Sequence, residues 1–196
     1  MTTLAILDLG YGNVRSVALA FARLGAAPVL TSDPTAALGA DRLVLPGVGA
    51  AANAMQRLCE TGLDQVIAQR TRPTLGICLG MQLMFRRSEE DGGTALLGLL
   101  EGTVAALEAG PGAPVPNMGW CALEDVANNL GLKEGDQLYF AHGFACPDGP
   151  ATAARARHGG HVFPAALRDG PHWGAQFHPE RSSAAGARFL SAFLRA

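Results

Sequence analysis

The chain has 196 residues, of which 48% are hydrophobic and 16% charged, so it can bury a sizeable core and is not intrinsically disordered. Its formal net charge is -2 with basic residues scattered, which excludes an electrostatic surface for nucleic acid or for an anionic membrane. Because no basic leader or roughly 20-residue apolar span is present, we expect one cytoplasmic domain over residues 1–196 whose ligands are small molecules or proteins.

The N-terminal half alternates between strand-like and helix-like segments. Residues 4–9 form a short apolar run, and apolar side chains then recur at helical spacing from Asn13 to Gly25. Further segments are predicted as buried strands at 28–31 and 42–45, helices at 50–59 and 62–70, and a strand at 74–77. Strands that alternate with helices are typical of a parallel sheet covered on both faces.

After about Gly98 the pattern changes to short β-like runs broken by glycine and proline. The clearest runs cover 137–144, 153–158 and 173–177, and an amphipathic helix is predicted over 183–194. We therefore predict an α/β fold: a single three-layer domain with a mainly parallel central sheet and a mixed or antiparallel extension in the C-terminal half.

The stretch G-I-C-L-G, from Gly76 to Gly80, lies where a predicted strand meets a predicted helix. It has the form of a nucleophile elbow with Cys78 in place of serine. Its glycines are expected because side chains two residues from the nucleophile would clash at so tight a turn. The helix start would favour the thiolate, and the Leu79 N–H is a natural oxyanion donor. The alternative is a buried cysteine at an ordinary tight turn.

A cysteine nucleophile usually needs a base, and the motif Q-F-H-P-E, beginning at Gln176, supplies a histidine with an acidic neighbour. Residues two apart on an extended segment point the same way. Since Pro179 keeps His178 extended, we expect Glu180 to reach the imidazole from the same side. Alone, the motif also fits a strand-end turn with surface side chains. Together with the elbow, it predicts a triad of Cys78, His178 and Glu180.

The order nucleophile, histidine, then acid two residues later resembles the class I glutamine amidotransferases and differs from that of α/β-hydrolases. Further stretches are similar to one subfamily, the glutaminase subunits of imidazole glycerol phosphate synthase in histidine biosynthesis. They are D-L-G-Y-G-N-V-R-S-V from Asp8, L-P-G-V-G from Leu45, P-N-M-G-W from Pro116 and Y-F-A-H-G-F from Tyr139. The resemblance therefore covers essentially the whole chain.

This resemblance implies a reaction and the residues that perform it. Cys78 would attack the side-chain amide of L-glutamine to give a thioester, His178 would protonate the departing ammonia and then activate water, and Glu180 would orient His178. The implied oxyanion residues are Gly47, Val48, Gly49 and Leu79. The implied substrate-binding residues are Gln82, His142, Gly143 and Phe144. No metal or other cofactor is expected, since the pair His158 and His161 has no third ligand at suitable spacing.

The resemblance also implies a partner, a (β/α)8-barrel cyclase subunit that forms a heterodimer with the glutaminase and consumes its ammonia. The length of the chain fits this expectation, because a glutaminase uses all of it and ammonia released to water would protonate. The implied partner-facing residues are Asn13, Asn117, Trp120 and Arg181.

The sequence departs from the usual family pattern at a few positions, namely Asn117, Cys121, Gly143, Phe144 and Arg181. These departures keep open a paralogous glutaminase that feeds a different synthase. A catalytically silent binding or regulatory homologue is a second alternative, which the intact predicted triad argues against.

Overall fold

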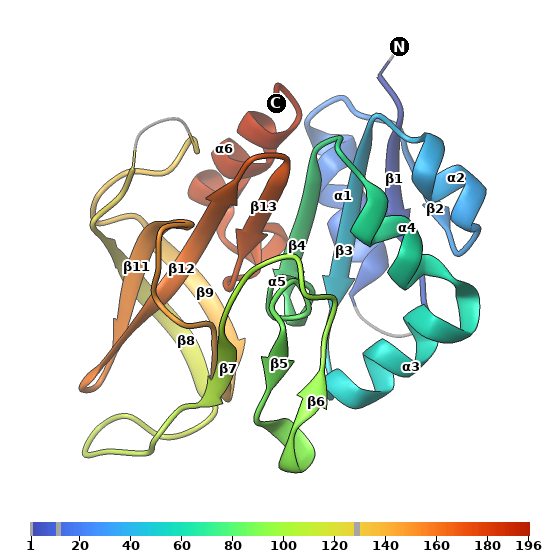
Figure 1. Cartoon of the computed structure of the whole chain (residues 1–196). Coiled ribbons are helices and arrows are strands. Elements are labelled where there is room, and N and C mark those ends of the chain that lie inside the picture. Colours follow the sequence, from blue (N-terminus) through green and yellow to red (C-terminus); the bar gives the residue numbers. More distant parts are fainter. Residues whose placement is uncertain (1, 11–12, 128–129) are drawn as a thin grey trace.

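The structure is a computed structural model that describes residues 2–10, 13–127 and 130–196. Its parallel strands are β1 (Leu4–Leu7), β2 (Pro28–Thr31), β3 (Arg42–Gly47) and β4 (Thr74–Cys78). β1 pairs with β2 and β3, and β3 pairs with β4. All four run in the same direction, so their carboxyl ends meet at one edge of the sheet, the lower edge in Figure 1. The predicted parallel sheet is confirmed.

The sheet continues beyond β4 with strands from the C-terminal half. These are β8 (Asn117–Glu124), β9 (Gln137–His142), β11 (Thr152–His158), β12 (His161–Asp169) and β13 (His172–Ala175). β13 is parallel to β4, and the remaining pairs are antiparallel. In the described part of the chain the nine strands have the order β2-β1-β3-β4-β13-β12-β11-β8-β9. The predicted mixed extension is therefore confirmed.

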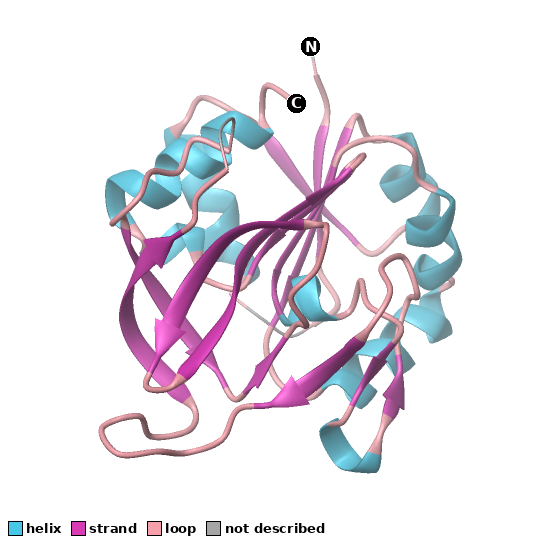
Figure 2. Ribbon diagram, turned by 60° about the vertical axis from the view of Figure 1, so that its left-hand side comes forward, coloured by secondary structure: helices cyan, strands magenta, loops and turns pink. Residues whose placement is uncertain are grey.

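Helices cover both faces of the parallel strands, as Figure 2 shows. Their bounds are α1 (Val14–Arg23), α2 (Pro34–Gly39), α3 (Ala51–Thr61), α4 (Leu63–Gln69) and α6 (Ser183–Phe193). Alternate side chains of β1 divide between two cores: Leu4 and Ile6 pack with residues of α1 and α6, and Ala5 and Leu7 pack with residues of α2, α3 and α4. No helix within the described ranges has the length and apolar character to cross a membrane.

A second, small sheet lies beside the short helix α5 (Leu79–Gln82), which directly follows β4 (Figure 1). Its strands are β5 (Arg87–Ser88), β6 (Thr94–Ala95), β7 (Thr103–Ala106) and β10 (Phe144–Ala145), with the 3-10 turn η1 (Glu90–Gly92) between β5 and β6. This sheet was not predicted from the sequence, because strands of only two to four residues are too short to show a periodicity.

Two local expectations differ from the structure, and one helix was not expected. The segment 28–31 was predicted as a buried strand, but β2 is an edge strand in which Val29 is 60% and Leu30 is 40% exposed. The predicted strand 137–144 is interrupted at Gly143, which separates β9 from β10. Helix α2 was not predicted, although Asp33 accepts a hydrogen bond from the Thr35 N–H at 3.0 Å as its N-cap.

Candidate active site

The predicted nucleophile elbow is present at the carboxyl end of β4. Cys78 has φ 53° and ψ -111°, a conformation that non-glycine residues rarely adopt, and its side chain is buried. Such strain persists only where the surrounding structure holds it in place. A Cβ atom on Gly76 would overlap the Gly80 carbonyl, and one on Gly80 would overlap the Leu45 carbonyl. Close backbone contacts therefore require both glycines, as the sequence predicted.

The helix after the elbow is shorter than expected, since α5 is a single turn of four residues. The dipole of so few peptide units is small, so the predicted stabilisation of a Cys78 thiolate by a helix dipole is minor. The sulfur instead contacts polar groups of other elements. Its S–H faces the carbonyl oxygen of Ala141 at 3.7 Å, and the Nε2 group of Gln176 donates to it at 3.8 Å.

His178 and Glu180 form a buried pair, with 3.0 Å between His178 Nδ1 and Glu180 Oε1. His178 is extended, as predicted, but Glu180 lies in the 3-10 turn η2 (Pro179–Arg181). The expectation that both residues belong to one extended segment is therefore wrong. The chain folds back after His178, and this turn brings the carboxylate to the ring. Asn13 Nδ2 donates to the same Glu180 oxygen at 3.5 Å.

The His178 ring is held in its charged form. Burial lowers the pKa of this imidazole, but its interactions with Cys78 and Glu180 outweigh burial and raise the pKa to about 10. The ring is thus protonated at neutral pH, its Nδ1–H donates to Glu180, and it can deliver a proton to a group bound beside Cys78.

Strand β9 fixes the position of the turn that carries His178. The His178 N–H donates to the carbonyl oxygen of Tyr139 at 2.8 Å. The Ser182 hydroxyl accepts from the Tyr139 N–H at 3.0 Å and donates to the His178 carbonyl at 2.6 Å. β9 and the His178 turn therefore form one hydrogen-bonded unit that presents the imidazole to the elbow.

A cavity of about 620 Å³ opens over Cys78. The structure brings most of the predicted site residues together as its lining: Asn13, Val48, Gly49, Cys78, Leu79, Gln82, His142, Gly143, Phe144, His178 and Arg181. Of the predicted oxyanion residues, Gly47 lies behind the cavity, where it pairs with Cys78 across β3 and β4. A Cβ on Gly47 would come 2.9 Å from the Leu79 Cβ, so this glycine permits the close packing of β3 on α5.

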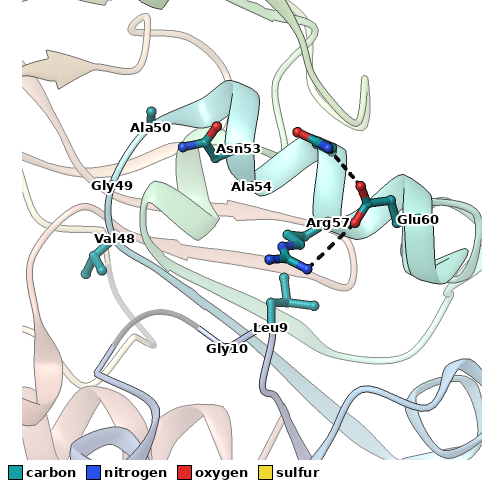
Figure 3. Close-up of a pocket in the computed structure, with 10 residues that line it drawn as sticks. Leu9, Gly10, Val48, Gly49, Ala50, Asn53, Ala54, Arg57 and Glu60 are labelled. Atoms are coloured by element: carbon teal, nitrogen blue, oxygen red, sulfur yellow. Dashed lines mark hydrogen bonds and ion pairs between the residues drawn. The ribbon is translucent and has the colours of Figure 1, made fainter.

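A second cavity, of about 580 Å³, shares Val48 and Gly49 with the first. Figure 3 shows Asn53, Arg57 and Glu60 of α3 along its other side. These α3 side chains are exposed, and Arg57 and Glu60 pair with each other at 3.8 Å. The groups that can perform acyl transfer line the first cavity, which we take as the candidate active site.

The side chain of Gln82 is fixed in one orientation. Its Nε2 group donates to the carbonyl oxygen of Phe144 at 2.8 Å and to Gln176 Oε1 at 3.1 Å. Both amide hydrogens are thereby used, so the group that Gln82 can offer to a ligand in the cavity is its carbonyl oxygen.

His142 is buried and neutral. Its Nδ1–H donates to the carbonyl oxygen of Phe144 at 2.8 Å, and its Nε2 accepts from Asn117 Nδ2 at 3.2 Å. Burial lowers the pKa of His142 to about 4. Asn117, predicted to face a partner, is only 2% exposed because it points inward to this ring. The partner-facing prediction is therefore wrong for Asn117.

We expect His142 to destabilise the protein as the pH falls from about 6.5 to about 4. Its folded-state pKa lies below the ordinary value of 6.5, so in this range the unfolded state binds more protons and the free energy of unfolding declines with falling pH. The expected loss is about 3 kcal/mol at the acidic end of the range. Urea unfolding across this range should show a weaker pH dependence for His142→Gln than for the wild type, and parallel curves would contradict the expectation.

The other predicted partner-facing residues lie at the rim of the cavity or near it. Trp120 is 52% exposed and packs edge-on against Tyr139, with 5.9 Å between ring centroids. The Arg181 guanidinium lies over the same tyrosine, 4.6 Å from the centroid of its ring. Tyr11 and Gly12, from the motif that distinguishes the subfamily, lie outside the described residues.

Three residues of the site were not predicted: Ala141, whose carbonyl faces the Cys78 sulfur, Glu90 and Gln176. Glu90 lines the cavity from η1, and its Oε2 accepts from the N–H of Ala51 at 2.7 Å. Its closeness to the elbow depends on the small sheet, which left no recognisable pattern in the sequence. Gln176 contacts the Cys78 sulfur. A signal for Gln176 was present, since it belongs to the same Q-F-H-P-E motif as His178 and Glu180.

Comparison with known proteins identifies the class to which this fold and site belong. The sequence matches the family model "Glutamine amidotransferase class-I" over residues 5–196. The fold is similar to a crystal structure of a glutamine amidotransferase, with a TM-score of 0.78 and 21% identity, covering 98% of this chain and 97% of that one. It is also similar to the structure of PurLQS from Thermotoga maritima, with a TM-score of 0.68 and 20% identity, covering 100% and 99%. Fold and site together define a glutamine amidotransferase.

Comparison with curated relatives shows to which family of class-I glutamine amidotransferases the chain belongs. The sequence is 45% identical over 197 residues to imidazole glycerol phosphate synthase subunit HisH 1 of Vibrio vulnificus strain YJ016, covering 96% of both chains. It is 45% identical over 192 residues to subunit HisH of Escherichia coli K12, covering 96% of this chain and 97% of the relative. The chain therefore belongs to the HisH family of class-I glutamine amidotransferases, which confirms the resemblance found in the sequence.

Proposed function

We propose that this chain hydrolyses L-glutamine to glutamate and ammonia and delivers the ammonia to a cyclase subunit of imidazole glycerol phosphate synthase, in the cytoplasm, for histidine biosynthesis. The observation that carries the chemistry is the strained Cys78 elbow, which shares one cavity with His178, the ring that Glu180 holds from the buried side. Relatives that are 45% identical and named as subunits of that synthase support the pathway.

The proposed reaction has two steps at the Cys78 sulfur. The thiolate attacks the side-chain amide carbon of glutamine, and the tetrahedral intermediate collapses to a thioester as the protonated His178 gives a proton to the departing ammonia. The ring, now neutral, takes a proton from water. The resulting hydroxide attacks the thioester and releases glutamate and the thiolate. Glu180 holds the His178 tautomer through the 3.0 Å Nδ1 bond throughout.

The oxyanion of each intermediate needs donors beside the sulfur. We propose that these are the N–H of Leu79 and an N–H of the Val48–Gly49 segment, since both elements line the cavity with Cys78. Gly49 has φ 91°, a conformation that favours glycine and permits the peptide to rotate. This segment is our candidate for the element that changes when a partner activates the enzyme.

Two acceptors in the cavity suit the α-ammonium group of glutamine. One is the free carbonyl oxygen of Gln82, and the other is the carboxylate of Glu90. The substrate carboxylate would then face the backbone from His142 to Phe144, where backbone N–H groups can receive it.

Glu90→Gln is expected to raise the KM for glutamine about 10- to 100-fold with little change in kcat. The variant loses a charge that would pair with the ammonium group in both the ground state and the transition state. The side chain introduced at position 90 still has a carbonyl oxygen that can accept from the Ala51 N–H, so the local structure is kept. Steady-state glutaminase kinetics check the prediction.

The neighbouring Glu89→Gln serves as the matched control. Glu89 accepts a hydrogen bond from Ala106 at an exposed position and does not line the cavity, so its removal should leave KM unchanged. An unchanged KM for Glu90→Gln as well would contradict the proposed recognition of the ammonium group.

We propose that the acceptor of ammonia is a (β/α)8-barrel cyclase in a heterodimer with this chain. Ammonia released to water would protonate and lose its nucleophilicity, so the cavity must be closed by the protein that uses it. The residues we expect at the interface are Asn13 and Arg181, which line the cavity, and Trp120, which is half exposed beside them. Calorimetric titration of this chain with the candidate cyclase tests the proposal, and the absence of a complex would contradict it.

The test of the function is release of glutamate from glutamine by the purified chain, alone and with the candidate cyclase and its nucleotide substrate. Low activity alone that rises with the cyclase would support the proposal. Strong release that ignores the cyclase would favour a glutaminase for another synthase. No release under any condition would favour a silent homologue.

A further inference from the structure

Two side-chain amides, those of Gln82 and Gln176, connect the lining of the cavity to the Cys78 sulfur by hydrogen bonds. Gln176 is fully buried between the cavity and the sulfur and directly follows β13. Its Nε2 lies 3.8 Å from the Cys78 sulfur, and its Oε1 lies 3.1 Å from Gln82 Nε2. Gln82 in turn donates to the carbonyl oxygen of Phe144 at 2.8 Å.

The direction of this chain of hydrogen bonds follows from one group whose role is unambiguous. The Phe144 carbonyl can only accept, so the atom of Gln82 that faces it is the amide nitrogen. The same nitrogen faces Gln176, so the Gln176 atom beside it is the oxygen. The remaining end of the Gln176 amide is then its NH2 group, and this group points at the Cys78 sulfur.

We propose that Gln176 is a positioning residue that holds the Cys78 sulfur with an N–H donor and stabilises its thiolate, and that Gln82 keeps the Gln176 amide in the required orientation. This inference rests on the proposed glutaminase function, because it assigns a role in activating the same nucleophile. Gln176 is then the single side chain between Gln82, which is proposed to bind glutamine, and Cys78, which is proposed to attack it.

The donor adds to the charge of His178, which also interacts with the sulfur, at a site where the dipole of the one-turn helix α5 contributes little. The Ala141 carbonyl, 3.7 Å from the sulfur, accepts from the thiol and opposes the thiolate. The titratable groups facing the sulfur are His178 and the buried Cys146, and Glu90 and Arg181 share its cavity. His178 favours the thiolate by its charge, and the Gln176 N–H adds a hydrogen bond from a fully buried side chain that does not line the cavity.

The test measures the rate of Cys78 alkylation by iodoacetamide against pH for the wild type, Gln176→Met and Gln82→Met. Methionine matches the length of glutamine but has no donor. For Gln176→Met we expect the midpoint of the profile to rise by about one pH unit, so that alkylation below both midpoints is about tenfold slower. For Gln82→Met we expect a smaller rise in the same direction. Glutaminase kcat should fall with KM nearly unchanged in Gln176→Met.

Control measurements distinguish stabilisation of the thiolate by Gln176 from a contribution to folding alone. They also distinguish failure of this proposal from failure of the proposed glutaminase function. Gln137→Met, at an exposed position of β9, should leave the midpoint unchanged. A Gln176→Met variant with lowered thermal stability but a wild-type midpoint would overturn the proposal. If Gln176→Met does not fold, an unchanged midpoint in Gln82→Met overturns it instead. Alkylation requires no glutamine hydrolysis, so a wild type that is alkylated but does not hydrolyse glutamine even with the cyclase and its nucleotide substrate refutes the proposed function and leaves this test intact.

Discussion

Replacement of Cys78 by alanine is expected to reduce glutamine hydrolysis by at least about 10³-fold, to the background of the assay. The thioester needs the sulfur, and no other nucleophile among the residues lining the described cavity can take its place. Binding of glutamine should persist, since the proposed ammonium acceptors Gln82 and Glu90 are untouched. Glutamate release and isothermal titration with glutamine measure the two quantities separately.

The control for this experiment is Cys59→Ala. Cys59 is an exposed cysteine on α3 whose sulfur lies 3.7 Å from an Asp64 carboxylate oxygen, away from the cavity. Its removal should leave hydrolysis intact. Substantial residual turnover in Cys78→Ala would show that another group performs the chemistry and would refute the assigned nucleophile.

Gly80→Ala is expected to destabilise the protein by about 3 kcal/mol or more, and the variant will fold only if α5 moves away from β3. The added Cβ would overlap the carbonyl oxygen of Leu45, a backbone atom that cannot rotate away. Urea unfolding measures the loss. Where folded protein is recovered, its glutaminase activity should also fall, because Gly80 fixes the backbone two residues after the nucleophile.

Gly39→Ala provides the matched comparison. Gly39 ends helix α2, and a Cβ built on it meets no atom within 4 Å. This variant should be as stable as the wild type or more stable by up to about 1 kcal/mol, since alanine is the better helix former. Equal stability changes for Gly80→Ala and Gly39→Ala would contradict the assigned packing of the elbow on β3.

The parts of the site that were predictable from sequence are those fixed by neighbours in the chain. Gly76 and Gly80 are present because the elbow backbone leaves no room for side chains, so the fold itself places this signal in the sequence. The pairing of His178 with Glu180 is similarly local. The backbone conformation that forms this pair was predicted incorrectly, because a 3-10 turn, and not an extended segment, brings the Glu180 carboxylate to the His178 ring.

The parts that were missed depend on contacts between distant segments. Glu90 reaches the cavity only because a small sheet carries η1 to the elbow. The inward orientation of Asn117 is set by the pairing of β8 with β9, which places Asn117 opposite His142. Sequence patterns report the period of a strand, but they do not state which neighbour it pairs with or which of its faces is covered.

The position of β13 in the sheet has a consequence for biosynthesis. β13 separates β4 from β12, so the strand that carries the nucleophile acquires its second neighbour only when one of the last segments of the sequence is in place. While the chain is being synthesised, β4 is an open edge, a site at which unpaired strands associate with other chains. The residues that complete the proposed triad, His178 and Glu180, follow shortly after β13. A ribosome-bound fragment that ends before β13 therefore has the proposed nucleophile without its proposed base, and we expect it to hydrolyse no glutamine.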